Sequence, residues 1–177
     1  MYKQNNKRKT AAQRISLYGI CIALAMILSY VETLIPIHFA VPGVKPGLAN
    51  LAVLAALYLM SPADAWTISL VRIVLVSFTF GNVAALLYSL AGAVMSLSVM
   101  TLCQKKGWLT MTGVSIIGGV MHNIGQLMMA AVILESIAVF TYLPVLLLAG
   151  ALAGALIGLL GGMMLKRLPY MLWRKQG

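Results

Sequence analysis

Several polar side chains lie inside apolar stretches of this sequence, where they are able to bind a polar molecule. Arg72 is central to the stretch SLVRIVLVSFTFG, and His122, Asn123 and Gln126 belong to MHNIGQLM. At about 100° per residue, the latter three occupy about 100° of a helical wheel and form one polar face. Guanidinium, imidazole and amide groups all donate hydrogen bonds, so we predict a substrate-binding site for an anionic or strongly polar group.

The segment VPGVKPGLAN, residues 41–50, adds two candidates to this site. Lys45 lies between two Pro-Gly pairs, and Asn50 lies one turn into the following apolar stretch. Lys45 either lines the mouth of an outward-facing cavity or extends to lipid headgroups, as interfacial lysines commonly do. We predict that Lys45 and Asn50 contribute to substrate binding.

Arg72 requires an explanation because a charge near the centre of a membrane costs from about 3 to more than 10 kcal/mol. One interpretation is a structural ion pair with Glu32, and the other is a ligand contact in which Glu32 holds the guanidinium in place. The polar face of His122, Asn123 and Gln126 has two interpretations as well, because polar side chains also join membrane helices.

Composition identifies the chain as a membrane protein. Of its 177 residues, 62% are hydrophobic and 9% are charged, whereas soluble domains average about 25% charged residues. The net charge of +10 does not indicate nucleic-acid binding. Eleven of the 13 basic residues precede the first apolar run, lie between the fourth and fifth, or follow the sixth. The positive-inside rule then predicts that both termini lie on the cytoplasmic side of the membrane.

The apolar runs predict an all-α bundle of six transmembrane helices, residues 15–165. Basic cytoplasmic tails, residues 1–14 and 166–177, flank it. Residues 135–143 either extend the fifth helix or lie flat on the outer surface. The expected helices cover about 15–35, 46–60, 62–80, 83–103, 113–134 and 144–165.

Local sequence defines two of these helix starts. Ser61-Pro62-Ala63-Asp64 resembles a capping box with proline at the first helical position, and Asn82 is suited to cap the fourth helix. The second helix, 15 residues long as predicted, spans about 22 Å of a hydrocarbon layer about 30 Å thick. The preceding segment, residues 36–45, is therefore expected to enter the outer half of the bundle.

Two rows of small residues predict close helix contacts. Gly150, Gly154, Gly158 and Gly162 recur every fourth residue in the last helix and predict tight helix packing. In the first helix Ser16, Gly19 and Ala23 form a similar row, which faces either an internal neighbour or a partner protein.

Enzyme motifs are missing from the sequence. It contains no Walker P-loop, no HExxH and no Gly-x-Ser-x-Gly, and its three acidic residues are isolated. We therefore expect no enzymatic activity, no metal and no cofactor.

Residues 15–165 resemble a bacterial membrane family called Gx transporter or heptaprenyl diphosphate synthase component I. The segments PGVKPGLANLAVLAALYL, SLVRIVLVSFTFG and HNIGQL carry this resemblance. The family is similar to the S components of energy-coupling factor (ECF) transporters. This implies six helices, capture of a small molecule from outside, and partnership with a transmembrane coupling protein and two ATPases. It also implies docking of the coupling protein on the first helix, where the row of Ser16, Gly19 and Ala23 is the candidate contact.

Three functional hypotheses follow. The first is a substrate-binding (S) subunit of an ECF-type uptake transporter in the bacterial cell membrane. The second is a non-catalytic membrane partner of a prenyl diphosphate synthase. The third is an autonomous carrier driven by an ion gradient, with Glu32 and His122 as proton sites.

Overall fold

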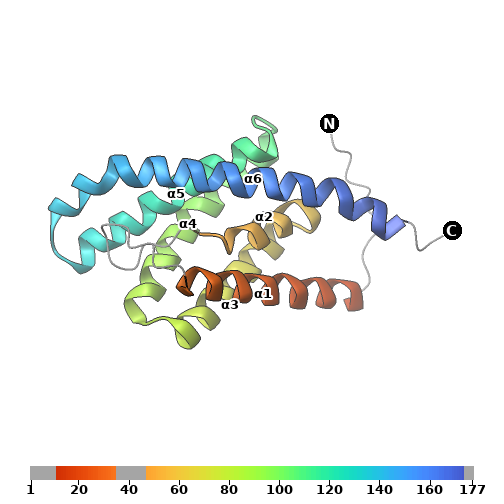
Figure 1. Cartoon of the computed structure of the whole chain (residues 1–177), viewed down its shortest axis with the longest axis horizontal. Coiled ribbons are helices and arrows are strands. Elements are labelled where there is room, and N and C mark those ends of the chain that lie inside the picture. Colours follow the sequence, from red (N-terminus) through yellow and green to blue (C-terminus); the bar gives the residue numbers. More distant parts are fainter. Residues whose placement is uncertain (1–10, 35–46, 174–177) are drawn as a thin grey trace.

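The computed structural model describes residues 11–34 and 47–173, and all regular structure in these ranges is helical (Figure 1). Lys45 and the segment 36–45 lie outside the described residues, so the expectations about them stay predictions. The elements are α1 (Ala11–Leu34), α2 (Asn50–Leu59), α3 (Pro62–Phe80), α4 (Val83–Lys106), α5 (Met111–Ile133), a 3-10 helix η1 (Ile137–Tyr142) and α6 (Leu143–Trp173).

The predicted membrane bundle is confirmed. Five described helices, all except α2 and η1, are long and apolar enough to cross a membrane. Helix α2 is apolar but has only 10 residues, about 15 Å of helix. The start of α1 and the end of α6 lie toward the same end of the bundle, as an even number of segments requires (Figure 1).

Both predicted helix caps are present. The Ser61 hydroxyl accepts a hydrogen bond from the Asp64 backbone N–H at 3.2 Å, and Pro62 opens α3. The Asn82 side chain accepts one from the Ala85 N–H at 2.8 Å. Because a cap depends on chemistry within three or four residues, the sequence alone identifies it.

The predicted start of the second helix, near Pro46, is wrong. Gly47 adopts a left-handed conformation with φ of +82°, and the helix begins at Asn50. A residue in this region interrupts a right-handed helix, and glycine adopts it without steric cost. The short helix is nevertheless the most enclosed one, since all residues from Ala52 to Leu57 are buried.

Several helices extend further than the apolar runs that predicted them. Helix α1 begins at Ala11, α4 continues through Lys106, and α6 reaches Trp173. Hydropathy identifies only the part of a helix that lipid surrounds. It does not detect polar helix ends, although lysine and glutamine are also good helix formers. Residues 135–143 do not extend α5: Glu135 turns the chain with φ of +48°, and η1 leads into α6.

The helices form two groups that meet at α2. Helix α5 packs against both α4 and α6, whereas α1 packs against α2 and α3. Helix α2 also contacts α6, and α3 contacts α4. Figure 1 shows α6 along the top with α5 next to it, α1 lower in the view, and α2 between α6 and α1. We call the boundary between α2 and the α4–α6 group the seam.

Glycines bring α5 and α6 into close contact. A Cβ atom added to Gly150 or Gly154 would lie within 3 Å of backbone atoms of α5. One added to Gly158 would lie 2.7 Å from Thr112 Cα. The expectation that Gly162 continues this row is corrected, because within the described ranges no atom lies within 4 Å of a Cβ added there. At about 100° per residue Gly162 is about 120° from Gly150, whereas Gly161 is within about 20° and faces Met111.

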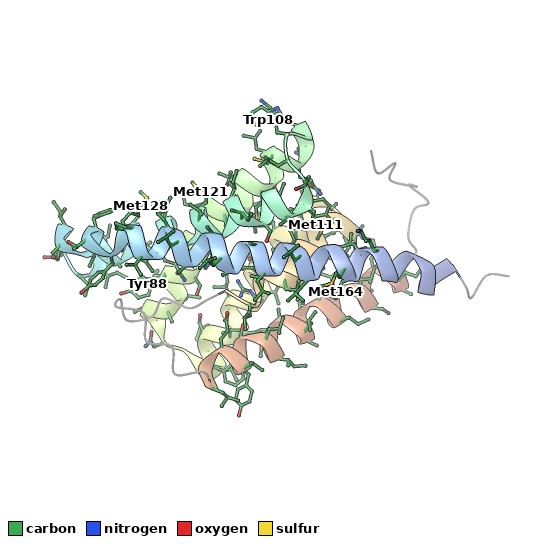
Figure 2. All side chains as sticks on the ribbon, turned by 45° about the horizontal axis from the view of Figure 1, so that its top comes forward. Tyr88, Trp108, Met111, Met121, Met128 and Met164 are labelled. Carbon is green, nitrogen blue, oxygen red and sulfur yellow. The ribbon has the colours of Figure 1, made fainter. Side chains whose placement is uncertain are left out.

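The turn between α4 and α5 presents an aromatic residue at the edge of the bundle. Figure 2 shows Trp108 at the far tip of this turn. The Trp108 side chain is 64% exposed, and Lys106 Nζ lies 4.4 Å from its ring centroid. Tryptophan next to lysine is typical of a membrane–water interface.

Candidate functional site

A polar cavity lies in the seam between α2 and the α4–α6 group. Its volume is about 20 Å³, and its lining combines apolar side chains and glycines with polar groups from three helices. Among the polar lining residues, Asn50 comes from α2, and the others come from α4 and α5. The polar lining residues are Asn50, Ser96, Ser115, His122 and Asn123.

The His122 imidazole is buried between α5 and α4. It is only 6% exposed and packs against Gly92, where any added Cβ would lie 2.8 Å from the ring. A residue larger than glycine at position 92 would displace the ring. Its Nδ1 lies 2.8 Å from the position of a Cβ added to Gly92 and has no hydrogen-bond partner among the described residues. A buried polar atom without a hydrogen-bond partner is uncommon in folded proteins.

Asn123 has a structural contact as well as a place in the cavity lining. Its Nδ2 donates a hydrogen bond of 2.7 Å to the backbone carbonyl of Leu146 on α6. The Nδ2 also lies 2.9 Å from the position of a Cβ added to Gly150. Asn123 therefore joins α5 to α6, and its remaining oxygen is available to a group in the cavity.

Arg72 and Gln126 are buried but do not line the cavity. Arg72 is 7% exposed and Gln126 is 2% exposed. Arg72 Nε and Gln126 Oε1 have no hydrogen-bond partner among the described residues. A buried guanidinium nitrogen without an acceptor is costly, and such groups concentrate at binding sites.

Glu32 links α1 to both α2 and Arg72. Its carboxylate accepts a hydrogen bond from the backbone N–H of Leu48, at the turn that opens α2. Glu32 also attracts the Arg72 guanidinium electrostatically, and Arg72 in turn lies within electrostatic range of His122. Arg72 thus lies within electrostatic range of an acid on α1 and of His122 on α5. The direct ion pair with Glu32 stays a prediction.

The structure brings together part of the predicted substrate-binding set. Asn50, His122 and Asn123 share the cavity, whereas Arg72 and Gln126 lie near this polar face without lining it. Sequence reasoning missed Ser96 and Ser115. The position of Ser115 had a detectable signal, because it precedes His122 by seven residues and falls within about 20° of it on the helical wheel.

A second polar cluster, also missed, joins the starts of α1 and α3. Asp64 Oδ1 accepts hydrogen bonds from Arg14 Nη2 at 2.7 Å and from the Tyr18 hydroxyl at 2.5 Å. The Ser61 hydroxyl donates to Asp64 Oδ2 at 2.7 Å. Asp64 is thus fully engaged in structural contacts. Within the described ranges, no three His, Cys, Asp or Glu side chains come together as a metal site requires.

The small residues of α1 face outward. Ser16, Gly19 and Ala23 are all exposed, and no atom of the described residues lies within 4 Å of a Cβ added to Gly19. The opposite face of α1, which includes Ala25 and Ser29, is buried against α2 and α3. The interpretation of this row as a contact with an internal neighbour is therefore wrong for the part of the chain described.

Comparison with known proteins gives a family and a fold. The family model described as heptaprenyl diphosphate synthase component I matches residues 21–164. A solved structure reported as "Structure and mechanism of the S component of a bacterial ECF transporter" superposes with a TM-score of 0.66. It is 16% identical, and the alignment covers 92% of this chain and 99% of that chain. A search of curated proteins gave no match.

Proposed function

The chain belongs to the heptaprenyl diphosphate synthase component I family, and from this premise and its fold we propose that it is a transporter substrate-binding subunit. The transporter is of the ECF type, located in the bacterial cell membrane. The chain captures a small polar or anionic molecule from the outer side and has no catalytic role. Both of its termini lie in the cytoplasm, where its basic residues are concentrated.

The observation that carries this proposal is a set of buried polar atoms without partners in a multi-pass membrane protein. Arg72 Nε, His122 Nδ1 and Gln126 Oε1 belong to this set. In a domain that served only as a membrane scaffold, such atoms would reduce stability without compensation. A ligand that accepts from Arg72 and donates to Gln126 would satisfy them.

The proposed substrate-binding residues are the ones predicted from the sequence. Asn50, His122 and Asn123 line the cavity, and Arg72 and Gln126 are buried outside its lining. The cavity of about 20 Å³ is much smaller than typical ligand pockets of about 300 Å³ or more. We infer that the ligand enters after the seam opens. Lys45, outside the described residues, stays a predicted contact.

The proposed partners are a transmembrane coupling protein and cytoplasmic ATPases. The exposed row of Ser16, Gly19 and Ala23 on α1 supports this part of the proposal, because small side chains permit close approach of another helix. Affinity purification of the tagged chain from membranes, followed by mass spectrometry, tests it. ATPases should co-purify. Their absence, together with ATP-independent uptake in liposomes, would contradict the ECF assignment and favour an autonomous carrier.

The family description supports one alternative: a non-catalytic membrane partner of a prenyl diphosphate synthase. Under this alternative, the same purification should recover a soluble prenyl synthase in place of ATPases. The two hypotheses predict different co-purifying proteins, so this one experiment distinguishes between them.

A further inference from the structure

We infer that the seam cavity is a hydration site, in which one water molecule bridges side chains of α2, α4 and α5. A buried water needs about 10–15 Å³ of accessible space, and the cavity has about 20 Å³. Organic ligands require far more space. The site is thus of the right size for a single water, and the inference holds whether or not the chain transports a substrate.

The polar groups around the cavity have unused hydrogen-bonding capacity. The Ser96 hydroxyl donates to Met100 Sδ at 3.3 Å, which is a weak acceptor, and its own lone pairs are not used in this contact. Asn123 donates through Nδ2 to Leu146 and retains its carbonyl oxygen. The His122 imidazole, 6% exposed, also borders the cavity.

Asn50 and Ser115 complete the lining from α2 and α5. The lining therefore offers two hydroxyls, two amides and an imidazole around a cavity whose volume fits one water molecule. A buried water typically makes about three hydrogen bonds to groups that otherwise lack partners. An apolar cavity of the same size would remain dry, because a water there would lose hydrogen bonds without replacement.

The position of the cavity gives this water a structural role. Asn50 is the only polar residue in the α2 segment 50–57, which is otherwise apolar and is buried from Ala52 to Leu57. Near the other end of α2, Gln104 Nε2 on α4 donates a direct hydrogen bond of 2.7 Å to the Leu57 carbonyl. The water supplies the corresponding link at the Asn50 end, so polar contacts hold both ends of the short helix to the α4–α6 group.

Nuclear magnetic resonance of histidine-labelled full-length protein in detergent micelles tests this inference. The chain has two histidines, so His38→Gln leaves His122 as the single labelled ring. We expect magnetisation transfer between the His122 ring protons and a long-lived water. Ser96→Ala and Asn50→Leu should weaken or abolish it and shift the ring nitrogen resonances. The matched control Ser98→Ala, an exposed position on the same helix as Ser96, should change neither signal.

The inference is overturned if the parent protein shows no transfer from water, or if Ser96→Ala, Asn50→Leu and Ser98→Ala give the same signal as the parent. If Asn50→Leu does not fold, Ser115→Ala takes its place, because it removes a hydroxyl and adds no volume. Partner purification is a separate measurement, so a dry cavity leaves the proposed transport function standing, and a failure to recover ATPases leaves the hydration site standing.

Discussion

Arg14 on α1 and Asp64 on α3 form an ion pair, with 2.7 Å between Nη2 and Oδ1. The Asp64 side chain is 7% exposed, whereas that of Arg14 is 54% exposed. Asp64 also accepts hydrogen bonds from Tyr18 and Ser61. The contact therefore attaches the start of α1 to the start of α3, and the Glu32 hydrogen bond to Leu48 attaches the other end of α1 to the start of α2.

Removal of Asp64 is expected to destabilise the bundle more than removal of Arg14. Asp64→Ala removes the acceptor of three side chains, each hydrogen bond contributing about 1 kcal/mol, whereas Arg14→Gln affects one half-exposed partner whose contribution solvent screens. Melting temperatures in detergent provide the comparison, with Lys105→Gln as an exposed charge control. If Arg14→Gln and Asp64→Ala lower the melting temperature equally, the ion pair, not the wider cluster, holds the two helices together.

Close packing of α5 on α6 should make Gly119 intolerant of any side chain. A Cβ at Gly119 would lie 2.3 Å from the Gly150 carbonyl oxygen, which is a backbone atom that cannot rotate away. Gly119→Ala should therefore destabilise the protein by about 1–3 kcal/mol, the usual cost of overpacking. Gly162→Ala is the matched control, since no atom lies within 4 Å of its added Cβ. It should leave the melting temperature unchanged or raise it slightly, because alanine favours helix.

The sequence predicted the elements whose signals are local. The caps at Ser61 and Asn82 depend on a few neighbouring residues and are present as expected. The start of α2 was placed too early because Pro46 was taken as the first helical residue, whereas a Pro-Gly pair also favours a turn in which glycine has a positive φ, as Gly47 does. Helix ends beyond the apolar runs, such as Lys106, were missed because hydropathy does not detect polar helical residues.

Only part of the candidate site was predicted, because only part of it depends on local sequence. His122 and Asn123 share one helix, so periodicity alone placed them together. The opposing residues Asn50 and Ser96 lie on other helices, and only tertiary packing determines that they reach the same cavity. Arg72 was expected in this cavity because it is charged, yet it lies beside the lining, toward Glu32.

Arg72 is expected to determine whether a small molecule stays bound. Native mass spectrometry of purified protein should detect a ligand that Arg72→Gln loses, because its buried Nε has no acceptor among the described residues. Arg72→Lys should retain little, since an ammonium lacks the planar donor geometry of guanidinium. Lys105→Gln, an equal charge change at an exposed position, should retain the ligand fully.

Glu32→Gln separates the two interpretations of Arg72. If Arg72 serves mainly as an ion-pair partner, Glu32→Gln and Arg72→Gln should lower the melting temperature alike, and neither should change ligand retention. If Arg72 binds ligand while Glu32 holds its guanidinium in place, Arg72→Gln should abolish retention and Glu32→Gln should weaken it. Equal retention by all variants would contradict a substrate-binding role for this residue.

The outward face of α1 is expected to bind the membrane partner. Gly19→Leu adds a large side chain where no atom lies within 4 Å of the Cβ position, so the melting temperature should not fall. The same side chain blocks the close approach that a row of small residues permits. Co-purification of the coupling protein and ATPases should therefore be lost. Ser98→Leu, an equivalent enlargement at an exposed position on α4, should retain them. Recovery of the same partners with Gly19→Leu would place the docking surface elsewhere, and it would leave the substrate-binding proposal intact because α1 contributes no cavity residue.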